Sequence, residues 1–126
     1  MSKMPVGELT IQTLAMPMDT NANGDIFGGW IVAQMDLAMG ILAKRVSKGR
    51  IVTVAINSMT FLKPVHVGCV VSCYVTLVKV GNSSMTMNVE VWAMPPDQQE
   101  VYQVTKGTFV AVAVDEQGKP RKVMQA

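Results

Sequence analysis

One carboxylate, that of Asp36, stands inside an otherwise apolar stretch of the chain. Residues 30–46 read as a helix whose apolar side chains point in nearly every direction around the axis, which predicts burial on all sides. The positions three and four residues from Asp36 are valine, alanine, methionine and glycine, so no neighbour on the helix can donate a side-chain hydrogen bond. A buried, unpaired carboxylate costs several kcal/mol or takes up a proton. Asp36 is therefore either a structural acid bonded to a loop or another subunit, or a base or nucleophile in a dry pocket.

A turn-rich loop over residues 19–29 leads into this helix. It ends in Gly28 and Gly29, which would let a substrate approach the backbone closely, and free N–H groups at a helix start attract negative charge. Such amides could form an oxyanion hole. Asn21 and Asp25 either cap the helix and shape the turn, or hold a water or a carbonyl oxygen.

Helix geometry separates these two groups. Asp36 lies about 12 Å along the helix from Gly28, at a rise of 1.5 Å per residue. A single chain would struggle to bring both to one small substrate. Two copies related by a dimer axis could pair the Gly28 end of one helix with Asp36 of the other.

The remaining segments predict strands. Alternating and β-branched residues mark strands over residues 8–14, 50–62, 70–80, 85–92 and 101–114, joined largely by short turns such as Gly81-Asn82. The order of one strand, one long helix and four strands predicts an α+β fold, with a five-stranded antiparallel sheet wrapped around one central helix. One helix cannot cover both faces of such a sheet, so a dimer is expected.

The composition narrows the class of protein. The 126 residues predict a single domain over 1–126, and 49% hydrophobic against 16% charged residues predicts a packed core. A net charge of +2 is too small to argue for nucleic acid binding. No uninterrupted apolar run reaches membrane-spanning length, and the first ten residues lack the apolar core of a signal peptide, so we expect a cytoplasmic protein with no membrane insertion.

Two cysteines and one histidine offer little redox or metal chemistry. Within one strand Cys69 and Cys73 would lie about 13 Å apart, beyond the roughly 7 Å that a disulfide spans, so we expect two small buried thiols. His66 is the only histidine, and we expect no metal site.

The segment "TLAMPMDTNANGDIFGGWIVAQMD" resembles the signature of YciA-type acyl-CoA thioesterases of the hotdog superfamily. The similarity continues through "GRIVTVAINSMTFLKPVHVG", "KVGNSS" and "VEVW" and covers nearly the whole chain. It implies a hotdog fold and hydrolysis of acyl-CoA to a free acid and CoA, with broad tolerance of the acyl chain and no cofactor. It also implies a homo-oligomer, usually a hexamer built as a trimer of hotdog dimers, with active sites at the dimer interface.

The same resemblance implies roles for particular residues. The catalytic carboxylate falls on Asp36 and the catalytic asparagine on Asn21, with backbone donors at Gly28 and Gly29; we group Asp25 with these donors as a substrate-binding residue. The positions implied for CoA are Thr60, Gly81, Ser83 and Ser84. Two departures from the wider superfamily are Phe27, where many members carry histidine, and Cys69, which is often aspartate.

Several alternatives stay open on the sequence. Asp36 either deprotonates a water or attacks the thioester to give a mixed anhydride, and Asn21 orients either the water or the carbonyl. A hotdog dehydratase using His66 and a non-catalytic acyl-CoA binder are the rival functions. Candidate cations for the CoA phosphates are Lys63, Lys79, Lys106, Lys119, Arg121 and Lys122.

Overall fold

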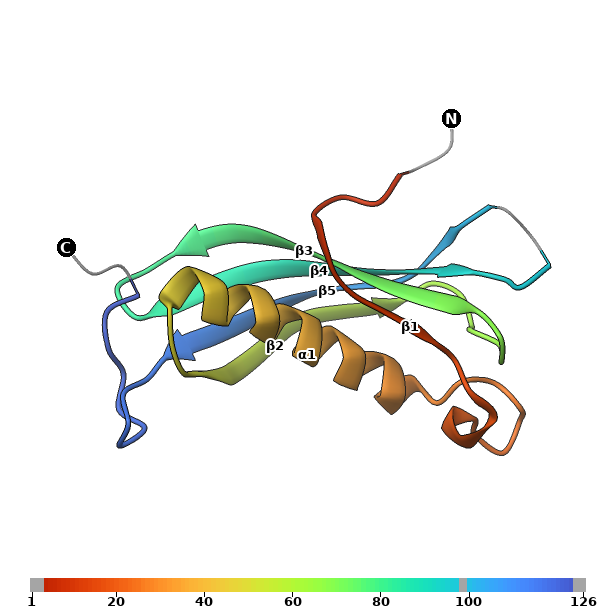
Figure 1. The fold of residues 1–126 in the computed structure, drawn as a ribbon, viewed down its shortest axis with the longest axis horizontal. Coiled ribbons are helices and arrows are strands. Elements are labelled where there is room, and N and C mark those ends of the chain that lie inside the picture. The colour runs from red at the N-terminus through yellow and green to blue at the C-terminus, as the bar shows by residue number, and fades with distance from the viewer. Residues whose placement is uncertain (1–3, 98–99, 124–126) are drawn as a thin grey trace.

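The computed structural model describes residues 4–97 and 100–123, and over these residues it contains one long helix and a five-stranded antiparallel sheet (Figure 1). This confirms the predicted α+β architecture. The elements in chain order are β1 (Glu8–Leu14), the 3₁₀ turn η1 (Pro17–Asp19), α1 (Gly28–Ser47), β2 (Ile51–Phe61), β3 (Val70–Val80), β4 (Ser84–Met94) and β5 (Tyr102–Ala113).

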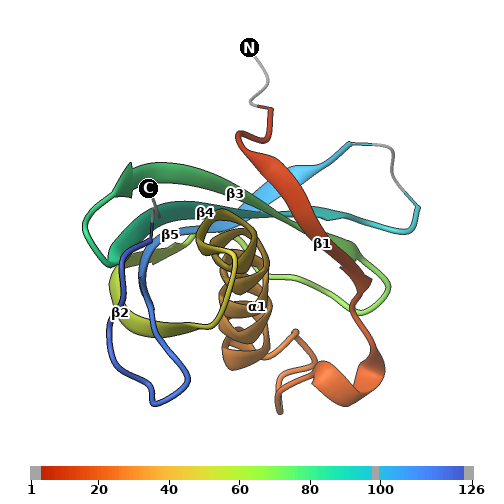
Figure 2. The same cartoon turned by 60° about the vertical axis from the view of Figure 1, so that its left-hand side comes forward.

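The sheet has the spatial order β1-β3-β4-β5-β2, and each neighbouring pair is antiparallel. Strands β3, β4 and β5 form consecutive hairpins at its centre, while β1 and β2 are its edges. The sheet arches over α1, which lies along its concave side (Figure 2). Side chains that alternate along the central strands therefore face either the helix or the convex outer surface.

Helix α1 begins two residues earlier than the sequence predicts, at Gly28. Phe27 occupies the N-cap position and makes no side-chain capping bond. At the other end, Lys48 adopts the left-handed conformation with φ of 58° and closes the helix. Lys44 and Arg45 lie in the last turn, where positive charge suits the helix dipole.

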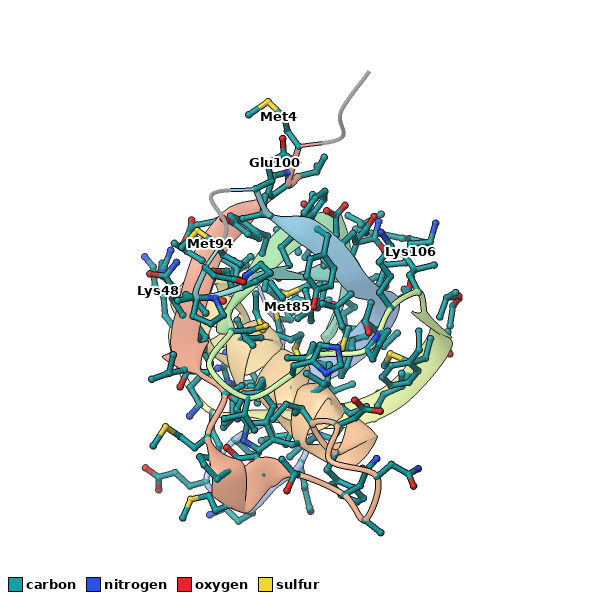
Figure 3. All side chains as sticks on the ribbon, turned by 90° about the vertical axis from the view of Figure 1, so that its right-hand side faces the viewer. Met4, Lys48, Met85, Met94, Glu100 and Lys106 are labelled. Carbon is teal, nitrogen blue, oxygen red and sulfur yellow. The ribbon has the colours of Figure 1, made fainter. Side chains whose placement is uncertain are left out.

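The core lies between α1 and the concave face of the sheet. Its largest fully buried side chains include four methionines and one phenylalanine: Met35, Met39, Met85, Met87 and Phe109. Figure 3 labels one buried and one exposed side chain for comparison: Met85 lies in this core, and Lys106 on β5 is exposed. Flexible methionine side chains fill the irregular space between a curved sheet and a cylinder.

One face of α1 is uncovered, so the expectation of a helix buried on every side is wrong for the single chain. Leu37 is 58% exposed and Ile41 41% exposed, because the sheet curves around only part of the helix. The adjacent edge strand β2 also exposes apolar side chains, among them Val54 and Ile56. Over the described residues, no helix combines the length and hydropathy that crossing a membrane requires.

Candidate active site around Asp36 and the loop before the helix

The carboxylate of Asp36 is paired across the seam between α1 and the edge strand β2. The hydroxyl of Thr53 donates to Asp36 Oδ1 at 2.6 Å. Thr53 faces the helix because its register partner on β5 is the buried Ala111. A short hydrogen bond to a charged oxygen fixes the carboxylate rotamer and leaves its second oxygen available.

Asp36 is half-buried in the single chain, so one chain alone does not form the dry pocket that one of the two alternatives requires. The seam is open because the neighbouring helix positions Ala33 and Leu37 are exposed. Gly40, one turn further on, brings the helix close to β2: a Cβ placed there would lie 3.9 Å from Ile51. The carboxylate therefore sits at the rim of an apolar surface, and full desolvation requires something to cover that surface.

Asn21 is held in a tight turn by its own carboxamide. Its Oδ1 accepts hydrogen bonds from the backbone N–H groups of Asn23 at 2.9 Å and Asp25 at 3.2 Å. Both donors are backbone amides, so the accepting atom must be the carboxamide oxygen. The Nδ2 group therefore points away from the turn, and Asn21 can offer a ligand only hydrogen-bond donors.

Gly28 and Gly29 are the first two residues of α1, and no side chain caps this helix start. Neither amide has a hydrogen-bond partner among the described residues, whereas the next two amides, at residues 30 and 31, bond to the Phe27 carbonyl at 3.0 and 3.3 Å. The Phe27 ring lies against Gly29, where a Cβ would come within 2.6 Å of it, and Phe61 lies 4.0 Å from the same position on Gly28. Two free amides flanked by half-exposed aromatic rings could donate hydrogen bonds to an anionic oxygen at the end of an apolar group.

Asp25 is not a free substrate-binding group in this structure. Its Oδ1 lies 3.1 Å from His66 Nδ1, in the loop between β2 and β3. The alternative that the loop residues cap the helix is also not realised, since Asn21 and Asp25 bond within the loop and to His66 instead. The sequence gives no signal for this contact, because Asp25 and His66 lie 41 positions apart in the chain.

The four positions implied for CoA do not form one cluster in the single chain. Thr60 pairs with Lys106 of β5 and Ser84 with Val112, so the two lie about 20 Å apart along that strand. Gly81 and Ser83 adjoin Ser84 in the β3–β4 turn, where the Gly81 amide donates to the Ser84 carbonyl at 2.8 Å. The set could contact only an extended ligand, or one that lies between two protomers.

Two of the three guanidinium nitrogens of Arg121 donate to backbone carbonyls, while its Nη2 is buried without a partner among the described residues. Its Nε donates to the Val114 carbonyl at 3.0 Å, and its Nη1 to the Ser47 carbonyl at 3.1 Å. The guanidinium packs so closely on Gly49 that a Cβ there would lie 2.6 Å from Nη2. Arg121 thus ties the segment after β5 to the last turn of α1.

The two thiols are buried and unbridged, which confirms the expectation from spacing. Burial raises the pKa of Cys73 to about 12. Burial, together with the neighbouring Cys69, also raises the pKa of Tyr102 to about 12. Neither thiol is poised as a nucleophile.

Comparisons with known proteins agree with the fold and the sequence motif. A family model described as "Thioesterase superfamily" matches residues 23–99. The acyl-CoA thioester hydrolase YciA of Salmonella typhimurium is 52% identical over 124 residues, which are 96% of this chain and 93% of that protein. The crystal structure of HI0827, described as a hexameric broad specificity acyl-coenzyme A thioesterase, is 51% identical with a TM-score of 0.92, covering 98% of this chain and 85% of that one.

A more distant similarity bears on the two candidate catalytic side chains. An acyl-CoA hydrolase from Staphylococcus aureus, crystallised with butyryl coenzyme A, is 27% identical with a TM-score of 0.82, covering 89% of this chain and 68% of that one. Alanine variants of one asparagine and one aspartate of that enzyme have been solved, and the two positions lie 15 residues apart. Asn21 and Asp36 have the same separation.

Proposed function

The chain belongs to the thioesterase superfamily, and from this premise we propose that it hydrolyses acyl-CoA thioesters to a carboxylic acid and CoA, with broad acyl-chain tolerance. YciA of Salmonella typhimurium and HI0827, both about half identical to this chain, are described as acyl-CoA thioesterases, the latter as broad in specificity. The observation that carries the proposal is the pairing of Asp36 with Thr53 at the rim of an uncovered apolar surface, on the helix whose first two amides are free hydrogen-bond donors.

The active site is completed by a second copy of the chain. The exposed side chains of Leu37 and Ile41 on α1, with the exposed edge strand β2, give an apolar surface that a partner would cover. Covering it would desolvate Asp36 and bring the Gly28 end of the partner helix toward it. HI0827 is described as hexameric, which supports a trimer of hotdog dimers here as well.

In the proposed reaction the thioester carbonyl oxygen accepts hydrogen bonds from the Gly28 and Gly29 amides. Negative charge that develops on this oxygen is stabilised by those donors in a site from which water is excluded. Asn21 Nδ2 donates either to the same oxygen or to the attacking water. The Asn21 Oδ1 already accepts two hydrogen bonds in the turn, so it does not also accept one from that water. The CoA thiolate leaves without a strong general acid, since thiols have a reference pKa near 8.5.

Asp36 has one of two roles. As a general base it takes a proton from water, whose oxygen then bonds to the acyl carbon as the C–S bond breaks. As a nucleophile it bonds to the acyl carbon directly, expels the thiolate and forms a mixed anhydride, which water later hydrolyses. A single turnover in ¹⁸O-water tests the nucleophilic route, because ¹⁸O enters the Asp36 carboxylate only if an anhydride forms and water attacks its aspartyl carbon.

The CoA moiety is proposed to extend from Thr60 on β2 toward the turn of residues 81–84, contributed by different protomers. Gly81, Ser83 and Ser84 lie on that turn, and the distance from Thr60 within one chain is too great for a single small group. The reaction as proposed uses side chains, backbone amides and water, and no cofactor or metal. We place the enzyme in the cytoplasm, whose reducing conditions suit two unbridged cysteines.

The decisive experiment compares wild type with Asp36→Asn by following thiol release from acyl-CoA. We expect kcat to fall at least 100-fold in the variant, while Glu116→Gln, an exposed carboxylate in the turn after β5, keeps the wild-type kcat. Unchanged hydrolysis by Asp36→Asn would remove the catalytic assignment. Binding of acyl-CoA by wild type without thiol release would favour a non-catalytic binder, and turnover of an enoyl-CoA without thiol release would favour a dehydratase.

A further inference from the structure

His66 contacts the loop that carries Asn21. Its Nδ1 lies 3.1 Å from Asp25 Oδ1, and both side chains are partly exposed. The loop before α1 has one other contact with the β2–β3 connection among the hydrogen bonds and ion pairs of the described residues, the backbone bond from Ile26 N–H to the Val65 carbonyl at 2.8 Å. Two contacts therefore join the loop before α1 to the β2–β3 connection, and His66 makes the one that is formed by side chains.

Asp25 transmits this attachment directly to Asn21. The Asp25 N–H donates to Asn21 Oδ1 at 3.2 Å, and the Asp25 carbonyl accepts from the Asn21 N–H at 2.7 Å. A displacement of Asp25 therefore rotates the Asn21 carboxamide, whose outward Nδ2 is the group proposed to face the reacting oxygen. Three direct contacts connect His66, Asp25 and Asn21.

The loop that carries His66 is itself braced, so it can serve as the fixed side of this attachment. The Tyr102 hydroxyl donates to the Pro64 carbonyl at 2.9 Å, and Val65 is buried. The Gly68 amide donates to the Ala15 carbonyl at 2.9 Å. The Asn21 loop, in contrast, is exposed over residues 21–24 and has few anchors of its own.

We propose that His66 is a positioning residue for Asn21, acting through the carboxylate of Asp25. A proton on Nδ1 attracts that carboxylate both in the neutral imidazole and, more strongly, in the imidazolium. The inference rests on the proposed catalytic role of Asn21 and reassigns Asp25 from substrate binding to the support of Asn21. His66 itself contacts no reacting atom.

A double-mutant cycle tests this assignment with kcat and KM measured for one acyl-CoA. We expect His66→Ala to lower kcat about threefold to fivefold, in line with an exposed pair, and to change KM less than twofold. In the Asn21→Ala background the same substitution should change kcat less than 1.5-fold, because the group it positions is absent. His66→Asn, which keeps a donor near the Nδ1 position, should restore most of the loss, and Gln117→Ala serves as a distant surface control.

The outcomes separate this inference from the proposed function. Full activity of His66→Ala beside an impaired Asn21→Ala overturns the positioning role alone. Equal losses in both backgrounds overturn it too, since His66 would then act through general stability, which thermal unfolding of each variant measures. Full activity of Asn21→Ala overturns the role of Asn21 and, with it, this inference.

Discussion

Thr53 and Asp36 join the edge strand β2 to the central helix through a hydrogen bond of 2.6 Å. The two residues are 17 positions apart, and the connection between them reverses the chain after Ser47. This bond places the only acid of α1 at the point where helix and edge strand meet. The carboxylate that the sequence leaves without a partner on its helix thus has one on the neighbouring strand.

Removing this hydroxyl should impair catalysis without unfolding the sheet. Thr53→Val keeps the shape and the strand preference of the side chain but loses the donor, so we expect kcat to fall about tenfold because the carboxylate is no longer held in one rotamer. Thr53→Ser retains the donor and should stay within threefold of wild type. Steady-state thiol release measures both, and a wild-type kcat for Thr53→Val would show that the bond has no catalytic part.

The orientation of Asn21 predicts a contrast between two of its substitutions. Asn21→Asp keeps an oxygen for the turn amides of Asn23 and Asp25 but replaces the Nδ2 donor by a second carboxylate oxygen. We expect its kcat to fall at least 100-fold, because a negative group would face the developing oxyanion, while the thermal unfolding midpoint changes little. Asn21→Ala should lose less activity than Asn21→Asp but more stability. Substantial activity of Asn21→Asp would mean that Asn21 works through its oxygen.

Local patterns predicted much of this molecule. Alternation along the strands and the apolar run of α1 depend on near neighbours, so the sequence predicts the element order correctly, although the helix begins two residues earlier and without a side-chain cap. The contacts that connect distant segments were missed. Two such contacts are those of Thr53 with Asp36 and of His66 with Asp25. They depend on strand register and loop packing, and neither produces a periodic pattern in the sequence.

Burial was the other property that local patterns misjudged. An all-round apolar helix predicted enclosure within one chain, yet the helix face around Leu37 is open. A sequence records that a surface is apolar, but not whether its own chain or a second copy covers it.

Arg121 should prove structural rather than substrate-binding. It donates to the Ser47 and Val114 carbonyls, so Arg121→Lys, which lacks the planar fork, should lower the free energy of unfolding by about 2 kcal/mol. The KM for acyl-CoA should remain within twofold of wild type. Denaturant titration and steady-state kinetics measure these quantities. A raised KM with unchanged stability would instead support contact with the CoA phosphates.

Because both cysteines are buried, we expect the native protein itself to give no signal in the thiol assay. We also expect it to lose stability at alkaline pH. Since both cysteines are buried, a disulfide reagent at pH 8 should react with less than about 0.1 thiol per native chain, and with two thiols per denatured chain.

The pKa of the Cys73 thiol is raised from 9.0 to about 12, so its contribution to stability is complete below pH 9 and is lost as the pH rises toward 12. Urea midpoints at pH 8 and 10 measure the loss, which Cys73→Ala should reduce; an equal loss in that variant would assign it to other groups.

The uncovered face of α1 predicts that assembly and catalysis depend on the same residues. Leu37→Glu places a charge in the surface that the partner is proposed to cover. The free energy needed to desolvate that charge exceeds the free energy gained from the contact. We expect the variant to elute as a monomer in light-scattering chromatography, to keep its far-UV circular dichroism and to lose at least 90% of its activity. Met4→Glu changes a side chain that is 76% exposed outside this surface and should leave both properties intact. Because the single chain separates Asp36 from Gly28 by about 12 Å, a Leu37→Glu monomer that still hydrolysed acyl-CoA at the wild-type rate would contradict the shared active site.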